Sequence, residues 1–173
     1  YKRQLQEWRS RMRICEFNKN KHLVGLRKCA IELQDYEHEL DPRLPAGADI
    51  VADYMPRMFF RCRNCAGKIL IAEVGDEVAG YAMVLTRVTS DEIEDGNFEY
   101  GLIADLMVLK EHRGQGLGRK LLESSEAYAR ERGVRWLRIG VLARNENAES
   151  LYAKMGFAKI YVEREKELTY HGG

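Results

Sequence analysis

Hydrophobic and polar positions divide the chain into blocks of strand-like and helix-like pattern. Strands are predicted at residues 12–17, 68–74, 78–88, 100–109 and 134–142. Helical spacing of apolar residues predicts helices over residues 21–40, 117–132 and 147–155, and a further apolar stripe follows Asp49. Strands and helices therefore mix along the chain, which predicts a mixed α/β (α+β) protein.

Turn-forming residues set the expected boundaries of these elements. Gly75-Asp76 suits a tight hairpin between two strands. Asp49 is expected to cap the second helix, and Pro56 is expected to kink or split it. Residues 157–161 and 163–168 are expected to form a final hairpin at the edge of the sheet.

The strand at residues 100–109 and the helix after it organise the rest of the chain. Apolar residues lie on both faces of this strand, so it should be central and covered on both sides. Gly114, Gly116 and Gly118 mark the turn before the helix. Glycines at a helix N-terminus let backbone N–H groups approach an anion, and the helix dipole adds partial positive charge. This stretch therefore predicts a phosphate or pyrophosphate site.

Two common phosphate-binding motifs do not fit these residues. A Walker loop needs Lys followed by Ser or Thr after its last glycine, whereas Gly118 is followed by Arg119-Lys120-Leu121. The dinucleotide fingerprint needs a third glycine at the position of Arg119. A nucleotide-binding module is therefore disfavoured.

Two other motifs, in the right order, resemble those of the GNAT superfamily of N-acetyltransferases. The first is Arg113-x-x-Gly116-x-Gly118, and the second is Asn-x-x-Ala-x-x-Leu-Tyr-x-x-x-Gly-Phe at residues 145–157. The resemblance is strong over residues 102–157 and extends by pattern over 12–168. It implies a GNAT fold, with a mostly antiparallel twisted sheet, a parallel pair of strands at the coenzyme A site and about four flanking helices. A single N-acetyltransferase domain is expected at residues 12–170, after an N-terminal extension, residues 1–11, of unknown role.

The resemblance also implies positions for acetyl-CoA, with no metal. The pantetheine arm would follow Leu106, Met107 and Val108, and Asn145 would reach its amide region. The pyrophosphate would lie on the turn, whose residues are Arg113, Gly114, Gln115, Gly116, Leu117, Gly118 and Arg119. Tyr152 would be the general acid that protonates the departing thiolate; the alternative is a core aromatic on an amphipathic helix.

The residue that accepts the amine's proton stays open. Glu99, just before the central strand, and Glu73, on the second strand, are candidates for the base. Asp105 is a third candidate, although its position on the strand also suits a hydrogen bond in the core. An amine that arrives neutral needs no dedicated base.

Composition narrows the class of protein. The chain has 173 residues and a formal net charge of +1, which suits a single domain and argues against nucleic acid as the main partner. No 18-residue apolar run is present, and the first ten residues lack a signal-peptide pattern, so no membrane segment and a cytoplasmic location are expected. Cys62 and Cys65 lack the second pair that a zinc site would need, and they are expected to be free thiols. A monomer or homodimer is expected.

The predicted activity is acetyl transfer from acetyl-CoA directly to a primary amine, either a small cationic amine or a peptide or protein amine. Candidates for a negative funnel that attracts a cationic acceptor are the carboxylates of the acidic loop Asp91–Asp95 and those of Glu99, Glu37, Glu39 and Asp41. These carboxylates are equally consistent with a solvated surface on which nearby lysines and arginines balance their charge. The alternative function is a GNAT-fold acyl-CoA sensor or interaction domain without turnover.

Overall fold

The computed structural model describes residues 12–90 and 93–168. The expected extension at residues 1–11, as well as Asp91 and Glu92 of the acidic loop, lies outside the described residues. The elements are β1 (Met12–Glu16), α2 (Lys19–Leu40), α3 (Gly47–Asn64), β2 (Lys68–Val74), β3 (Glu77–Thr89), the short helix η1 (Ile93–Asp95), β4 (Glu99–Val108), the short helix η2 (Lys110–His112), α4 (Leu117–Glu131), β5 (Leu137–Ile139) and α5 (Glu146–Lys154).

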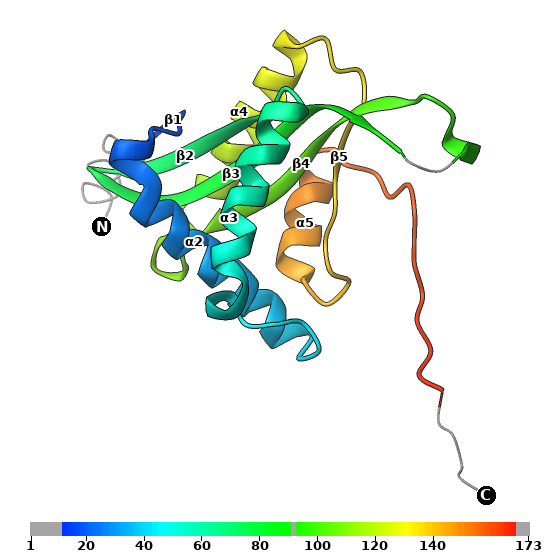
Figure 1. Ribbon diagram of the computed structural model, residues 1–173, viewed down its shortest axis with the longest axis horizontal. Coiled ribbons are helices and arrows are strands. Elements are labelled where there is room, and N and C mark those ends of the chain that lie inside the picture. The colour runs from blue at the N-terminus through cyan, green and yellow to red at the C-terminus, as the bar shows by residue number, and fades with distance from the viewer. Residues whose placement is uncertain (1–11, 91–92, 169–173) are drawn as a thin grey trace, which may run out of the picture.

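Five strands form one sheet in the order β1-β2-β3-β4-β5. All neighbours are antiparallel except β4 and β5, which are parallel and are connected through α4. Helices α2 and α3 lie on one face of the sheet and α4 lies on the other (Figure 1). The predicted mixed α/β fold with one parallel pair is confirmed. No helix in the described part of the chain is long and apolar enough to cross a membrane.

Each face of the sheet has its own core. Leu26, Met58 and Tyr81 are buried in the core beneath α2 and α3. Leu121 and Leu122 of α4 are buried against the other face, with Ile103 of β4. The central strand is therefore covered on both sides, as its apolar pattern predicts.

A β-bulge interrupts the central strand β4. Asp105 pairs with Met83 and Ile103 pairs with Val84, so Ala104 is an extra residue without a partner on β3. Ile103 packs in the α4 core, whereas Ala104 packs on the α2–α3 side. Asp105 bonds to Tyr81 on that same side. The bulge thus places two successive residues on one face, which regular strand alternation does not allow.

The second helix is capped differently from its prediction, and Pro56 does not split it. Pro56 lies inside an unsplit α3, and the N-cap is Ala46 rather than Asp49. Pro56 and Ala52, whose carbonyl loses its helical donor, are both exposed, so water can satisfy that carbonyl. The cap is supplied from α2, where Asp35 accepts a hydrogen bond from the Gly47 N–H at 2.7 Å.

The predicted C-terminal hairpin is wrong. Strand β5 is limited to three residues, and residues 157–168 contain no strand. This tail leaves the body of the protein, and its residues 158–168 are exposed (Figure 1). Residues 163–167 read Glu-Arg-Glu-Lys-Glu, so a strand there would have no apolar face to bury. An ion pair of 2.7 Å between Arg43 and Glu165 ties the tail to the α2–α3 loop instead.

Candidate active site

A cavity of about 260 Å³ lies beside the point where β4 and β5 separate. The two strands pair only as far as Ile103 and Ile139, while β4 continues to Val108. Helices α2 and α3 and the first turns of α5 supply the other walls. The polar side chains that line the cavity are those of Gln34, Glu37, Tyr54, Arg61, Asp105, Asn145 and Tyr152.

A buried carboxylate forms part of the floor of this cavity. Asp105 accepts hydrogen bonds from the Tyr54 hydroxyl at 2.6 and 2.7 Å and from the Tyr81 hydroxyl at 3.0 Å. Burial raises the pKa of Asp105, while the two hydroxyl donors act in the opposite direction. Burial and the Asp105 charge raise the pKa of both tyrosines, which therefore remain protonated donors. Asp105 thus has the core hydrogen-bonding role that its strand position suggested.

Glu37 and Tyr152 face the same cavity. Burial, and then the Asp105 charge, raise the pKa of Glu37. Burial, and then the Glu37 charge, raise the pKa of Tyr152 to about 12. Among the described residues, the Tyr152 hydroxyl has no hydrogen-bond partner, and its ring meets Phe157 edge-on at 6.2 Å. The cavity therefore holds a protonated phenol and a carboxyl group of raised proton affinity.

The glycine turn before α4 is shaped for an anion. Gly114 and Gly116 have positive φ values of 74° and 88°, and a Cβ at either position would have no neighbour within 4 Å. Gly116 is the N-cap of α4, and no side chain caps the helix. The first N–H groups of the helix therefore point to open space beside the positive end of its dipole. This geometry fits a pyrophosphate.

The two sequence motifs meet in space. A Cβ added at Gly118, in the first motif, would lie 3.3 Å from Leu151 of the second. Asn145 begins α5, where its side-chain oxygen accepts the Ala148 N–H at 3.1 Å. Asn145 also lines the cavity together with Tyr152. Segments far apart in sequence thus form one continuous region from the glycine turn to the cavity.

The two arginines of the turn make different contacts. Arg113 donates from Nε to the Val108 carbonyl at 2.9 Å, and its guanidinium lies 5.1 Å from the centre of the Tyr36 ring. Arg119 is exposed, and it lies 4.0 Å from Glu123 one turn along α4. Arg113 therefore spans the end of β4, whereas Arg119 extends along the helix surface.

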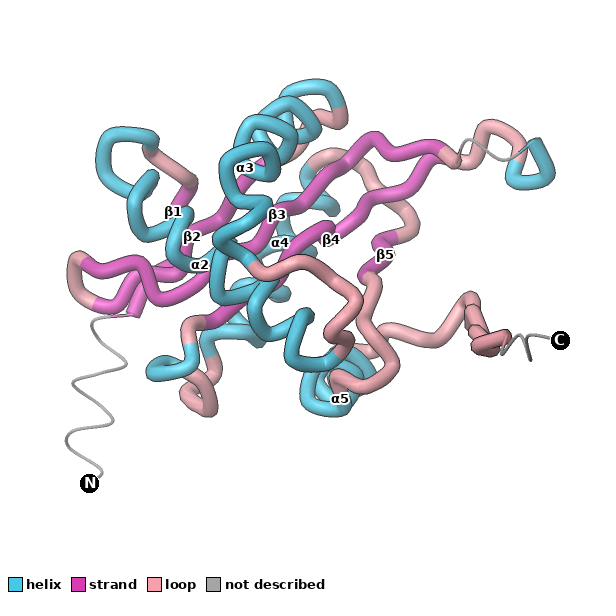
Figure 2. The backbone as a smooth tube through the Cα atoms, turned by 60° about the horizontal axis from the view of Figure 1, so that its bottom comes forward, coloured by secondary structure: helices cyan, strands magenta, loops and turns pink. Residues whose placement is uncertain are grey.

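The other candidate carboxylates lie outside the cavity. Glu99 is exposed at the start of β4, six residues before Asp105, with Arg87 at 3.5 Å. The short helix η1 of the acidic loop lies at the tip of the projecting β3–β4 hairpin (Figure 2). Asp41 bonds to Arg43 at 2.8 Å, and that partner lowers the pKa of Asp41 to about 2. Of the described funnel candidates, Glu37 lines the cavity, whereas Glu39, Asp41, Glu94 and Glu99 do not.

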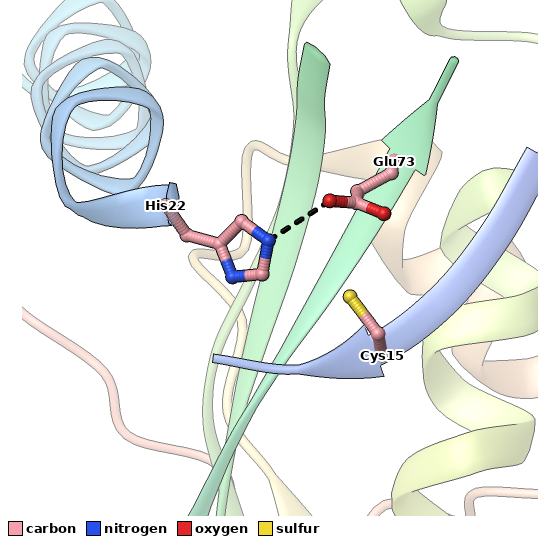
Figure 3. Close-up of side chains that lie close together, drawn as sticks. All are labelled: Cys15, His22 and Glu73. Atoms are coloured by element: carbon pink, nitrogen blue, oxygen red, sulfur yellow. Dashed lines mark hydrogen bonds and ion pairs between the residues drawn. The ribbon is translucent and has the colours of Figure 1, made fainter. Parts of the chain in front are cut away.

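The remaining base candidate, Glu73, belongs to a separate cluster with His22 and Cys15 (Figure 3). Glu73 forms ion pairs with Arg13 and with Lys21, the latter at 2.6 Å, and accepts from His22 Nε2 at 2.9 Å. Burial alone would raise the pKa of Glu73, but these donors outweigh it and hold the pKa at about 2. A carboxylate with this pKa is a weak proton acceptor at neutral pH.

Sequence spacing gave no sign that Cys15, His22 and Glu73 meet, because they come from β1, α2 and β2. Within the described residues they are the one group close enough to hold a metal ion. However, the Asn18 N–H donates to His22 Nδ1 at 2.9 Å, so the ring proton lies on Nε2, towards Glu73. Burial raises the pKa of the Cys15 thiol, and two cations already neutralise Glu73. The hydrogen bonds of this cluster suit an ion-pair network rather than a ligand set.

Replacing Glu73 with Gln should destabilise the protein by about 1–3 kcal/mol at pH 7, because two cations lose their buried partner. The lowered pKa means that the contribution of Glu73 is complete above the unfolded-state pKa of roughly 4.3 and is lost as pH falls towards 2. The difference between Glu73→Gln and wild type, measured by denaturant unfolding, should therefore shrink between pH 5 and pH 2. Glu77→Gln, at an exposed position on β3, is the control. A pH-independent difference would contradict the ion-pair account.

Comparisons with known proteins show the family of this chain. Residues 32–157 match the sequence profile of the "Acetyltransferase (GNAT) family". An L-amino acid N-acyltransferase, MnaT of Escherichia coli, is 28% identical over 131 residues, which cover 75% of this chain and 73% of that protein. An uncharacterised N-acetyltransferase, YobR of Bacillus subtilis, is 33% identical over 76 residues, or 44% of this chain. A GNAT-family acetyltransferase structure from Staphylococcus aureus aligns with a TM-score of 0.67 at 17% identity, covering 87% of this chain and 86% of that one.

The matched lengths vary among the curated relatives. The alignments span 30% of YobR and about half of two further N-acetyltransferases. The shared region in each case includes only part of the relative. The similarity to these relatives is therefore limited to the region that matches the acetyltransferase family.

Proposed function

Because the chain belongs to the GNAT family of acetyltransferases, we propose that it transfers an acetyl group from acetyl-CoA directly to a primary amine in the cavity beside β4 and β5. The observation that carries this proposal is the continuity between the glycine turn and the cavity. The glycine turn at one end suits the pyrophosphate of the coenzyme. At the other end, the Tyr152 phenol and the Glu37 carboxyl group suit the departing thiolate and the amine. Alignment of the reactants supplies much of the rate enhancement in acyl transfer.

Acetyl-CoA would supply the activated acetyl thioester. The N–H groups of residues 113–119 would hold its pyrophosphate, and the free edge of β4 at residues 106–108 would lie along its pantetheine arm. The open space at Gly114 and Gly116 and the uncapped start of α4 fit such a group. Tyr152 would hold a proton for the departing sulfur, because its pKa of about 12 keeps it protonated at neutral pH.

We propose Glu37 as the group that accepts the amine's proton, in place of Glu99. Glu37 lines the cavity, whereas Glu99 does not. In the wild type, kcat/KM should fall as pH drops through the raised pKa of Glu37. A Glu37→Gln variant should lose this acidic limb, while Glu99→Gln should keep it. A pH profile of kcat/KM that is the same for wild type and Glu37→Gln would show that the amine arrives neutral or uses another base.

A panel of amines with free CoA thiol as the readout tests the proposed function. Thiol release that depends on both acetyl-CoA and an amine would support it. Thermal stabilisation by acetyl-CoA without thiol release on any amine would instead favour the sensor or interaction domain. The cytoplasmic location and the monomeric or homodimeric state remain predictions from the sequence.

A further inference from the structure

One cation lines the cavity without a partner. Arg61 of α3 is half-buried, and its side chain makes no hydrogen bond and no ion pair with the described residues. Arg61 lines the same cavity as the buried carboxylate of Asp105, and its positive charge acts to lower the pKa of that group. A half-buried guanidinium has five N–H donors to satisfy, and those that face the cavity are free to bind an acceptor molecule.

The opposite charge is present in the same cavity. Glu37 and Asp105 provide two carboxyl groups on its α2 and β4 walls. The Glu37 side chain has no hydrogen bond or ion pair within the described part of the chain, and both hydroxyl donors of Asp105 come from the α3 and β3 side. The cavity therefore offers one free cation and a free carboxylate to one small molecule.

Resting on the proposed function, we propose that the acceptor is a free amino acid, whose amine lies towards Glu37 and whose carboxylate binds Arg61. Guanidinium binds a carboxylate through paired N–H donors, and this arrangement fixes both position and orientation. Arg61 is thereby a specificity-determining residue. It also repels the second cation of a polyamine, so it selects against the cationic acceptors that the acidic segments suggested.

The size of the cavity supports a small acceptor. Its volume of about 260 Å³ lies just below the range of roughly 300–1,000 Å³ that is typical of ligand pockets. A free amino acid carries both charges within one small molecule. The terminal amine of a peptide has no carboxylate beside it, because the α-carboxyl group of that residue forms a peptide bond.

Matched pairs of an amino acid and its decarboxylated amine test the proposal, for example tyrosine with tyramine and phenylalanine with phenethylamine, because neither amine carries a second cation. The wild type should prefer the amino acid of each pair by at least about tenfold in kcat/KM. Arg61→Gln should lower kcat/KM for the amino acid by roughly 10- to 100-fold, mainly through KM, as expected from the loss of charge-assisted hydrogen bonds. The same variant should change kcat/KM for the decarboxylated amine by less than twofold.

Arg57→Gln is the matched control, because Arg57 is exposed one turn earlier on α3 and outside the cavity. It should leave the amino-acid preference unchanged. Arg61→Lys, which keeps the charge but not the paired donors, should retain part of the preference. Equal rates for both members of each pair in the wild type, or an equal loss for both in Arg61→Gln, would overturn the proposal.

Binding separates this proposal from the proposed function. If no amine releases thiol, the proposed function fails, but calorimetric titration of the CoA-saturated protein with the same pairs still decides the acceptor. Binding of the amino acid that is weakened by Arg61→Gln and unaffected by Arg57→Gln supports the amino-acid site. Absence of amino-acid binding, or binding that is insensitive to Arg61→Gln, overturns it.

Discussion

Gly116→Glu is expected to weaken acetyl-CoA binding by at least about a hundredfold. The new carboxylate would enter the open space in front of α4, where the pyrophosphate is proposed to lie. Two unit charges 4 Å apart repel by roughly 4 kcal/mol at an effective dielectric constant of 20, which exceeds the free energy of a hundredfold change. Isothermal titration calorimetry with acetyl-CoA measures the effect directly.

Two variants separate charge from backbone strain. Gly116→Gln has the same bulk and the same strain at φ 88° without the charge, so it should bind acetyl-CoA more tightly than Gly116→Glu. Gly133→Glu places the same residue at a similar φ of 75°, with open space around it, just beyond the other end of α4. Gly133→Glu should lose about as much stability as Gly116→Glu but keep its affinity for acetyl-CoA. Unchanged affinity in a folded Gly116→Glu protein would remove the anion site from the glycine turn.

Tyr152→Phe is expected to lower kcat by roughly a hundred- to ten-thousandfold, the usual range for general acid catalysis. The substitution keeps the ring and its contact with Phe157. Because the hydroxyl has no hydrogen-bond partner among the described residues, its loss should leave Tm and acetyl-CoA affinity nearly unchanged. Single-turnover measurement of thiol release isolates the chemical step.

Tyr128→Phe, on α4, is the control, because it removes a hydroxyl that is hydrogen-bonded but lies outside the cavity. The Tyr128 hydroxyl donates to the Ala66 carbonyl at 3.0 Å and is remote from the cavity. This variant should lose about 1 kcal/mol of stability and keep its turnover. If Tyr152→Phe behaved like Tyr128→Phe, with normal turnover and lower stability, Tyr152 would be a core residue and the acid would lie elsewhere.

Local patterns predicted most of the fold. Alternating and helical spacing located the elements from Met12 to Met155, and the glycine turn marked the start of α4. These features depend on residues close together in sequence, where periodicity is informative. Pro56 was misleading because its effect depends on whether the freed carbonyl meets water, which the local pattern does not show. The prediction of a C-terminal hairpin was wrong because a strand needs an apolar face to bury, and residues 163–167 provide none.

The cavity was only partly predictable. Its motif residues, Asn145 and Tyr152, were found because they belong to a recognisable spacing. Tyr54 and Arg61 are seven residues apart on one face of α3, a signal that was available but equally typical of an ordinary helix surface. Their importance depends on Asp105, which lies on the same face of β4 as Ala104 because of the bulge. Regular alternation puts two successive residues on opposite faces, so the sequence pattern did not show that both face the cavity side.

At that bulge β4 has one residue more than β3, and a second irregularity, between Leu85 and Val88, gives β3 one residue more than β4. A gene that had lost the codon for Ala104 would encode a strand in which Ile103 and Asp105 alternate normally and every later side chain keeps its present face. Such a protein should fold, but the strand would no longer bend beside β5, and pairing could continue past Ile103 into the space of the cavity. Within this chain, a single-residue deletion is therefore the smallest genetic step from a sheet whose last two strands separate beside the cavity to one in which they stay paired.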